Sequence, residues 1–406
     1  MDARQERGMM IAATTKIRRH GAAYMVPAQS RPGTEYTVFP KSKRCDCPDF
    51  ELRQLECKHL FAVQFVMQRE TVTNAKGETT VTETRAVRLT YAQNWPAYNA
   101  AQTTEKDTFC KLLRDLCANV PQPAPGRGRP RLPIGDMLFA AAFKVYSTVS
   151  GRRFMTDLRH AQEQGLIERT PHYNSIFNVI EDETLTPILH DLITTSAAPL
   201  KEVEQDFAVD STGFGTSQFF RYYSIKYQGE VEAHDWIKAH AMVGVKTNVV
   251  TAVRITERHG ADFNELHPLA HKTAETFTMR EVSADKAYSG RFNLKTIAAL
   301  GAEPFIPFKT NAIPCKYSAL WNRLFHYFCM NRDEFLTHYH KRSNVESTFS
   351  AIKRVFGGRV RSKTPVAQKN EVLLKILCHN IRCLIHEMHE LGITPVFDRA
   401  LTTAAS

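Results

Sequence analysis

The chain has 406 residues, 43% of them hydrophobic, and its 53 Lys and Arg outnumber its 42 Asp and Glu to give a net charge of +11. This length allows two or three domains, and the positive charge favours a polyanionic partner such as nucleic acid, although many enzymes are mildly basic. No apolar run approaches the roughly 18 residues that span a bilayer, and no secretory signal opens the chain, so we expect no membrane association. The odd count of nine cysteines argues against a disulfide framework.

Residues 1–95 contain the densest group of cysteine and histidine. Cys45 and Cys47 are followed after nine residues by Cys57 and His59, and these four ligands can close a tetrahedral Zn²⁺ site. An extended run at 36–39 would carry the first pair, and a helix that begins near His59 would carry the second. The alternative is four buried side chains without metal. The pattern resembles the SWIM-type zinc finger over residues 36–66, and such fingers bind DNA or protein.

Residues 96–133 are predicted to hold a helix at 104–118 and then a linker rich in Pro, Gly and Arg. The linker contains the Arg-Gly-Arg-Pro core of an AT-hook, an extended segment that enters a narrow A·T minor groove. A solvated basic linker explains it equally well. In either case Arg127, Arg129 and Arg131 would attract DNA phosphates in a salt-dependent manner.

Residues 134–204 show apolar positions at helical spacing, and we interpret them as a helical DNA-binding domain. Residues 205–392 alternate between β-branched runs and helix-period stretches, which indicates an α/β domain with a central sheet. Residues 393–406 are left as a tail. The expected strands are Phe207–Val209, Ala241–Val245, Val249–Ile255, Glu281–Ala284 and Pro304–Phe308. The expected helices are Asp262–Thr276, Arg291–Leu300, Val345–Phe356 and Glu371–Glu390.

The strongest functional pattern is Tyr339, Arg342, Glu346 and Lys353, with the spacing Y-x2-R-x3-E-x6-K. On a helix, Arg342, Glu346 and Lys353 would share a polar face opposite an apolar one. A basic amphipathic surface helix would explain the same residues. The spacing matches the YREK signature, and the segment resembles prokaryotic insertion-sequence transposases that carry a DDE triad.

With this resemblance, two more carboxylates follow. Asp210 ends an apolar strand and precedes small polar residues, and Asp285 ends a second short strand. The resemblance implies an RNase H-like mixed sheet in which the two strands lie side by side and Glu346 arrives from a helix. Taken singly, each aspartate is better explained as a turn residue at a strand end, and only the combination with the signature favours a functional role.

The resemblance also implies the chemistry. Asp210, Asp285 and Glu346 would hold two Mg²⁺ (or Mn²⁺) ions, which stabilise the entering and leaving oxygens of an in-line phosphoryl substitution. Tyr339, Arg342 and Lys353 would contact the DNA. It further implies double-stranded DNA as partner, a homodimer in the synaptic complex, and a place at the nucleoid in a prokaryotic cytoplasm. Whether the 3′-OH acts directly or through a hairpin stays open, as do two rival functions: a domesticated regulator and a nuclease without strand transfer.

Two further groups are predicted to be structural. Cys378, His379, Cys383 and His386 lie in a strongly apolar helix, where a metal site is geometrically possible but core packing is favoured. We also expect Trp321 to pack in a core.

Overall fold

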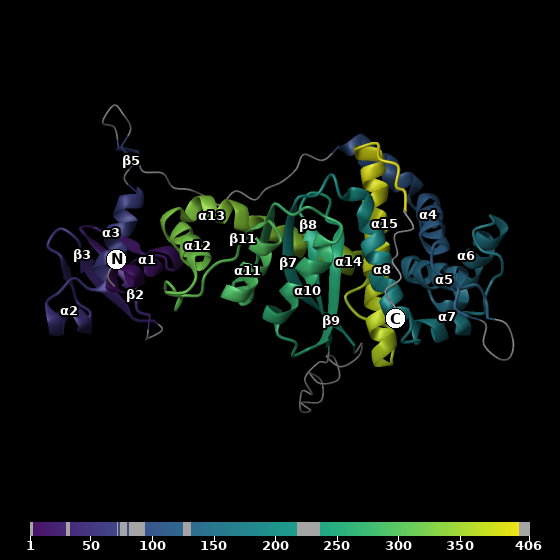
Figure 1. Cartoon of the computed structure of the whole chain (residues 1–406), viewed down its shortest axis with the longest axis horizontal. Coiled ribbons are helices and arrows are strands. Elements are labelled where there is room, and N and C mark those ends of the chain that lie inside the picture. The colour runs from purple at the N-terminus through teal and green to yellow at the C-terminus, as the bar shows by residue number, and fades with distance from the viewer. Residues whose placement is uncertain are drawn as a thin grey trace. The chain divides into compact units, whose positions relative to one another are not determined.

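The computed structural model describes residues 3–29, 33–70, 72–73, 79–80, 94–124, 131–216 and 236–397. The chain forms two compact units, whose elements are labelled in Figure 1. The first unit comprises Met1–Arg88, Ser289–Lys295 and Phe305–His340, and the second comprises Leu89–Tyr288, Thr296–Pro304 and Lys341–Ser406. Each unit is therefore assembled from segments that are distant in the sequence.

The N-terminal part of the first unit combines a small sheet with helices. The sheet has the order β1-β2-β3-β4 (Arg18–His20, Ala23–Pro27, Glu35–Phe39, Arg44–Cys45), and each neighbouring pair is antiparallel. The helices are α1 (Ala3–Thr14), α2 (Pro48–Arg53) and α3 (Lys58–Glu70). Two short strands, β5 (Val72–Thr73) and β6 (Thr79–Thr80), pair with each other after α3.

Helices α1 and α3 approach each other closely in this unit. A Cβ atom at Gly8 would come within 2.5 Å of the Cβ of Phe61 and 2.8 Å of the Lys58 carbonyl oxygen. Only glycine therefore fits at this crossing. The core beneath it includes Ile11, Val26, Val38, Leu60 and Val63, together with three cysteines.

The second part of the first unit is an aromatic cluster built on α12 (Ala319–Met330) and α13 (Arg332–Tyr339). Phe305 stacks on His338 at 4.3 Å, and Phe328 meets Phe335 edge to face at 5.1 Å. Trp321 packs against Phe308 at 4.8 Å and donates its indole N–H to the Ile313 carbonyl. Trp321 is thus part of this cluster, as its expected packing role requires.

The second unit contains a sheet of order β11-β10-β7-β8-β9. Its strands are β7 (Asp206–Gly215), β8 (Trp236–Gly244), β9 (Val250–Glu257), β10 (Glu281–Ala284) and β11 (Glu303–Phe305), the last residue of which falls in the first unit. β8 is antiparallel to both β7 and β9, whereas β10 is parallel to β7. The expected α/β class with a mixed sheet is confirmed.

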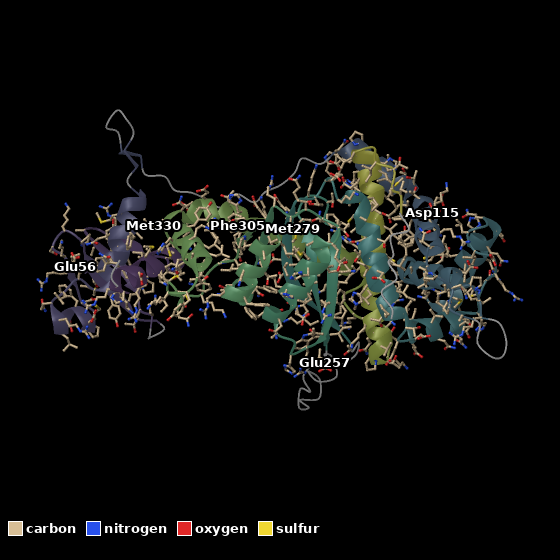
Figure 2. All side chains as sticks on the ribbon, in the orientation of Figure 1. Glu56, Asp115, Glu257, Met279, Phe305 and Met330 are labelled. Carbon is tan, nitrogen blue, oxygen red and sulfur yellow. The ribbon has the colours of Figure 1, made fainter. Side chains whose placement is uncertain are left out.

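The helices of the second unit pack on this sheet or on one another, and Figure 2 shows the side chains along the ribbon. They are α4 (Trp95–Ala118), α5 (Ile134–Ser147), α6 (Gly151–Glu163), α7 (Tyr173–Ile180), α8 (Leu185–Ala197), α10 (Asp262–Ala274), α14 (Ser343–Phe356) and α15 (Pro365–Glu390); α11 (Arg291–Ala299) is divided between the units. The described residues also include three short 3₁₀ helices, η1 (Ala198–Leu200), η2 (Lys286–Tyr288) and η3 (His340–Arg342).

The long helix α15 joins the helical region to the sheet. Thr364 caps its start by accepting a hydrogen bond from the Ala367 N–H, and Pro365 suits its first turn. The buried Asn380 side chain accepts from the Val250 N–H at 2.9 Å and donates to the Val250 carbonyl at 2.8 Å. α15 thereby satisfies the backbone of β9, which is an edge strand.

The units differ from the expected boundaries in two respects. Residues 134–204 and the sheet belong to one unit, because α15 contacts α4, α5 and α8 as well as β9. Phe305–His340, which we expected within the 205–392 domain, groups with the N-terminal unit, because α12 contacts α1. None of the helices that the structure describes is long and apolar enough to cross a bilayer.

Candidate active site and metal centre

Two of the three expected carboxylates lie on neighbouring parallel strands. Ala284 at the end of β10 is in register with Val209 of β7. The next residues along the two strands are Asp285 and Asp210, so the register brings these aspartates to the same level of the sheet. This is the placement that a shared metal site on adjacent strands requires.

Asp210 does not end its strand, contrary to the expectation. β7 continues to Gly215, and its residues Ser211–Gly215 stay paired with His240–Trp236 of β8. The pairing of β7 with β10, in contrast, ends at Ala284. The aspartate therefore sits in a continuous strand at the point where its parallel neighbour ends.

Arg342 links Asp210 to the third carboxylate. Its Nη1 donates to Asp210 Oδ2 at 2.5 Å, and its Nη2 donates to Glu346 Oε1 at 2.6 Å. The side chains of Asp210 and Arg342 are 20% and 19% exposed, whereas that of Glu346 is 58% exposed. A guanidinium ion thus faces two acids that would otherwise repel each other.

The electrostatics of Asp210 report the proximity of all three acids. Burial raises the pKa of Asp210, and the negative charges of Glu346 and Asp285 raise it further. The Ser211 N–H and the Arg342 guanidinium oppose this rise. The oxygens of the three carboxylates do not all lie within 4.8 Å of one another, although all three residues are among those described. In this arrangement the acids are neighbours but do not converge on one point.

Helix α14 carries Glu346 and Lys353 on its polar side, and its apolar side is buried as expected through Val345, Phe349, Ile352 and Phe356. Arg342 precedes the helix in η3, so the signature begins just before α14 and not within it. Lys353 Nζ donates to Thr212 Oγ1 at 2.6 Å and lies over the Phe214 ring, and burial lowers its pKa. Lys353 is therefore directed at β7, the strand of Asp210.

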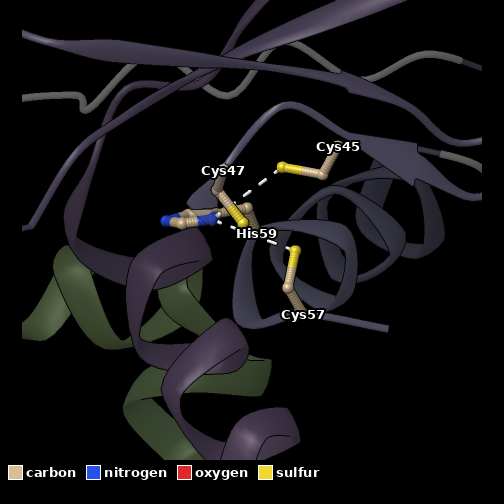
Figure 3. A group of neighbouring side chains, drawn as sticks. All are labelled: Cys45, Cys47, Cys57 and His59. Atoms are coloured by element: carbon tan, nitrogen blue, oxygen red, sulfur yellow. Dashed lines mark hydrogen bonds between the residues drawn. The ribbon is translucent and has the colours of Figure 1, made fainter. Parts of the chain in front are cut away.

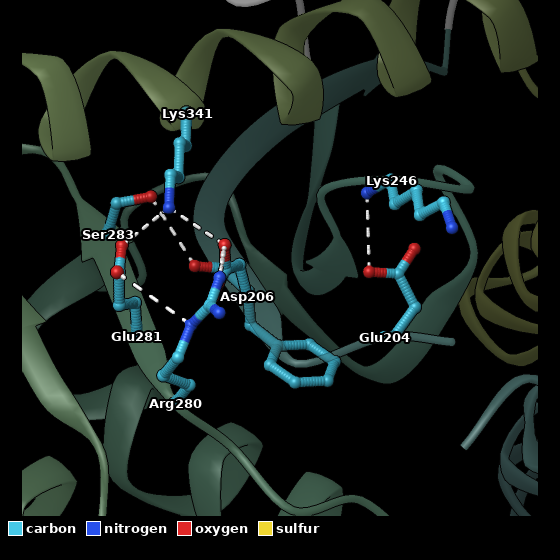
Figure 4. Close-up of polar contacts among 8 residues, drawn as sticks. Glu204, Asp206, Lys246, Arg280, Glu281, Ser283 and Lys341 are labelled. Carbon is cyan, nitrogen blue, oxygen red and sulfur yellow. Dashed lines mark hydrogen bonds and ion pairs between the residues drawn. The ribbon is translucent and has the colours of Figure 1, made fainter. Parts of the chain in front are cut away.

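An ion network next to this site was not expected from the sequence (Figure 4). Lys341 Nζ donates to Asp206 at 2.7 Å and to Glu281 at 2.6 Å, and its side chain is 12% exposed. Asp206 and Glu281 are paired in register on β7 and β10, and Arg280 forms two hydrogen bonds to Asp206. Asp206 lies four residues before Asp210, hence on the same face of β7. The four-residue spacing of Asp206 and Asp210, together with the neighbouring cations Lys341 and Arg342, is the sequence pattern that could have predicted the network.

Tyr339, the first residue of the signature, is the last residue of α13 and belongs to the first unit, whereas Arg342, Glu346 and Lys353 belong to the second. It is partly buried, and its ring is tilted against that of His340 at 5.6 Å. The signature therefore spans the point where the chain passes from one unit to the other.

The four expected zinc ligands form a compact, buried cluster in the first unit (Figure 3). Cys45, Cys47, Cys57 and His59 are at most 5% exposed. His59 Nδ1 lies 4.0 Å from the Cys45 sulfur and 3.9 Å from the Cys57 sulfur, and all four ligand atoms are within 4.8 Å of one another. Ligands of a tetrahedral zinc are about 3.5–3.8 Å apart, so a small contraction would close the site.

The sulfur chemistry of the cluster is that of a cation site. A hydrogen bond with Cys45 lowers the pKa of Cys57 to about 3, which favours its thiolate form. The same hydrogen bond, together with burial, raises the pKa of Cys45. Thiolate and imidazole donors in a buried, four-membered set suit Zn²⁺ and leave no open position for a substrate.

The remaining expectations concern the linker and α15. Arg127 and Arg129 lie outside the described residues, and Arg131 is exposed. His379 Nε2 donates to the Asn248 carbonyl at 2.9 Å, and burial lowers the pKa of His379 to about 4. The Cys378 thiol contacts the Ala142 carbonyl. His386 instead faces Glu387 and Glu390, so this group packs and does not gather as a Cys/His site.

Comparison with known proteins gives two matches to this chain. The family model described as the transposase DDE domain matches residues 201–381. Over 211 residues the chain is 26% identical to a protein of Archaeoglobus fulgidus described as "Probable transposase for insertion sequence element ISA1214". This alignment covers 52% of the chain and 62% of that relative. No solved structure matches the chain significantly.

Proposed function

We propose that the protein is an insertion-sequence transposase that cleaves DNA strands and transfers the cut end, because its residues 201–381 match the family model of the transposase DDE domain. The observation that carries this proposal is the meeting of Asp210 and Asp285 on parallel neighbouring strands, with Glu346 joined to Asp210 through Arg342. Two copies would act together, since two DNA ends must be held at once.

The fold in this proposal is RNase H-like. The support is the mixed sheet, in which β7 lies between the antiparallel β8 and the parallel β10. Helix α14 contacts β7 and brings Glu346 to that strand. The order of chemistry along the chain, two strand aspartates followed by a helix glutamate, is the order that the family resemblance implies.

Asp210, Asp285 and Glu346 would hold Mg²⁺ or Mn²⁺. These oxygen donors fit a hard cation, and Arg342 already brings positive charge to two of them. When bound, two such ions stabilise the entering and leaving oxygens of a phosphoryl substitution. Arg342 would exchange its carboxylate partners for a DNA phosphate, which a guanidinium binds equally well.

The signature residues around the acids would hold the DNA strand. Lys353 lies against Thr212, two residues beyond Asp210 on β7, so its ammonium would need only a short movement to meet a phosphate. Tyr339 would help to position the strand. In the first unit, Cys45, Cys47, Cys57 and His59 would hold one structural Zn²⁺ in a SWIM-type finger.

The test replaces one acid without changing its shape. Asp210→Asn should reduce Mg²⁺-dependent cleavage of the cognate end by a factor of at least about 10³ while DNA binding stays intact, since the amide cannot supply an anionic ligand. The matched control is Asp191→Asn, an exposed aspartate on α8. Equal cleavage by Asp210→Asn and wild type would refute the assignment.

The products of the same reaction distinguish a transposase from a nuclease. A transposase joins the freed 3′ end to target DNA, and sequencing of the joints should reveal a short target duplication. Cleaved ends that are never joined would favour the nuclease. Binding without cleavage by the wild-type protein would favour the regulator.

A further inference from the structure

A cavity of about 530 Å³ lies in the second unit, away from the three acids. Its walls come from the end of α5, the start of α6, α7, the end of α14 and the start of α15. Apolar side chains form much of the wall, including Phe177 and Phe356. Phe177 is 41% exposed and meets the Tyr173 ring edge to face at 6.5 Å, so part of its ring is open to the cavity side. The volume is typical of a site for a small organic molecule.

Lys144 is a buried cation in this wall. It is only 8% exposed, and no hydrogen bond or ion pair of its ammonium group is found among the described residues. Burial lowers the pKa of Lys144, the charge of Arg361 lowers it further, and the negative charge of Glu371 opposes this lowering. Lys144 therefore feels the charge of an acid but has no directly paired anion among the described residues.

The acids of the cavity do not supply this anion. Glu371 accepts hydrogen bonds from the backbone N–H groups of Arg361 and Ser362 and pairs with Lys375 at 3.2 Å. Glu181 is exposed. The Arg361 guanidinium donates to the Thr148 carbonyl at 2.6 Å, a neutral partner. Three cations of the lining, Lys144, Arg361 and Lys363, therefore have no paired carboxylate among the described residues. Of these, Lys144 and Arg361 are the two that influence each other's charge.

We propose that this cavity binds one nucleotide, with its phosphate at Lys144 and Arg361 and its base against the rings of Phe177 and Phe356. A nucleotide combines an anion with a flat aromatic surface, and the cavity offers a partner for each part. Base–aromatic contact and phosphate–cation contact are the usual means of holding an unpaired nucleotide.

The nucleotide belongs to the DNA strand, a point that rests on the proposed function. Helix α14 carries Glu346 in its first turn and ends at Phe356 in the cavity wall. Ten residues of helix span about 15 Å. A single DNA strand covers this distance with about two to five nucleotides. Lys353 lies between these two points. The cavity is therefore placed to hold an unpaired nucleotide of a strand whose phosphodiester lies at the three acids.

The experiment uses the full-length protein and two fluorescent probes, without Mg²⁺ so that no strand is cut. One probe is etheno-deoxyadenosine monophosphate, and the other is a single-stranded oligonucleotide that carries the same fluorescent base. Wild type should bind the oligonucleotide and quench its base. Lys144→Met should weaken this binding at least about tenfold by loss of the phosphate contact, and Phe177→Ala should abolish the quenching.

Lys111→Met, an exposed lysine on α4, is the matched control and should bind as wild type does. Because Phe177 is already exposed, Phe177→Ala should fold even if the lysine variant does not, which circular dichroism would establish. Failure of wild type to bind either probe, or unchanged binding and quenching in both folded variants, would overturn the proposal. Binding of the free nucleotide but not of the oligonucleotide would overturn its assignment to the DNA strand.

Cleavage, measured separately with Mg²⁺, keeps the two proposals apart. Wild type that cleaves DNA but binds no probe would refute the cavity and leave the transposase standing. Wild type that binds the nucleotide through Lys144 but never cleaves would refute the transposase and leave a nucleotide site.

Discussion

Asp210 and Arg342 form the contact on which the candidate active site depends. Two carboxylates, Asp210 and Glu346, share one guanidinium. The pKa of Asp210 is nevertheless raised, because burial and the charges of Glu346 and Asp285 outweigh the help from Arg342 and the Ser211 N–H. The folded protein therefore favours the protonated aspartate relative to the unfolded chain, and holding the ionised form costs stability.

This cost predicts how stability depends on pH. A carboxyl group whose pKa is higher in the folded than in the unfolded protein lowers the free energy of unfolding as the pH rises. The loss develops between the pKa in the unfolded chain, about 3.9, and the pKa in the folded protein. At higher pH the loss stays constant. Asp210→Asn imitates the protonated form, so it should unfold with a higher free energy than wild type at pH 7. The difference should vanish as the pH falls towards 3.9. Urea unfolding at several pH values, with Asp191→Asn as control, measures it; a less stable Asp210→Asn at pH 7 would contradict the raised pKa.

At this scale the sequence singled out candidate residues but not their contacts. Glu346 and its neighbours were found because their spacing is a local pattern. The salt bridge from Lys341 to Asp206 and Glu281 was missed, since it joins positions far apart in the chain. Lys144 was missed for another reason: nothing in an apolar helix sequence distinguishes a paired buried lysine from an unpaired one.

Among the elements, η3 and the start of α14 are fixed to the sheet by Lys341. Its ammonium neutralises Asp206 and Glu281, which face each other at the start of β7 and β10. Arg342 is the next residue, so the anchor also sets where the guanidinium meets Asp210. The stability of this turn and the geometry of the acids are therefore coupled.

We expect Lys341→Met to lower the free energy of unfolding by about 1–3 kcal/mol, because it leaves two half-buried carboxylates with one cation fewer. Lys341→Arg should restore much of the loss. Lys246→Met, at an exposed lysine, should have little effect. Urea unfolding measures the change, and DNA cleavage at saturating DNA tests the positioning role: kcat should fall with Lys341→Met and recover with Lys341→Arg. Unchanged stability and kcat in Lys341→Met would show that the network does not position the site.

The cluster of Cys45, Cys47, Cys57 and His59 connects β4, α2 and α3, three short elements. Purified protein should contain about one Zn²⁺ per chain. Cys57→Ser should lose most of the metal and lower the melting temperature of the first unit, because the metal holds these elements together. Cys110→Ser, a buried cysteine outside the cluster, should keep its zinc. Metal analysis decides: zinc-free wild type, with normal folding of Cys57→Ser, would refute the finger.

The observed bounds of helices and strands agree with the predicted ones where the sequence pattern is local. β10 has its expected bounds and α10 begins where expected. β8 begins at Trp236, five residues before the expected start, because its first residues gain their hydrogen bonds from the extension of β7. Pairing between strands of this kind depends on tertiary structure, which a window of residues does not contain.

For the whole molecule, the net charge of +11 predicts DNA binding that weakens with salt. If the linker arginines contact phosphates, replacing Arg127, Arg129 and Arg131 with alanine should reduce the slope of log affinity against log salt by up to about 3. A control with Lys41, Lys111 and Lys201 replaced, all exposed, removes equal charge elsewhere. Fluorescence anisotropy at several salt concentrations measures both; equal slopes for the two variants would show that the linker has no special role.

The grouping into units was the least predictable feature, because composition changes along the chain report on local segments only. α15 unites the helical region with the sheet through contacts such as those of Asn380, which lies 130 positions from Val250. The Phe305–His340 segment likewise joins the N-terminal unit through helix packing. Such long-range contacts leave no periodic signal.

The way the first unit is put together limits how this protein can be shortened or recombined. Its Cys/His cluster occupies the N-terminal segment, yet α12, from a segment some 300 residues later, packs on α1. Removing residues 1–88 would therefore strip α12 and its phenylalanines of their neighbour and expose apolar surface to water, with aggregation as the expected result. A finger that looks like a detachable module in the sequence is, in the folded chain, not one that gene fusion or truncation could exchange freely.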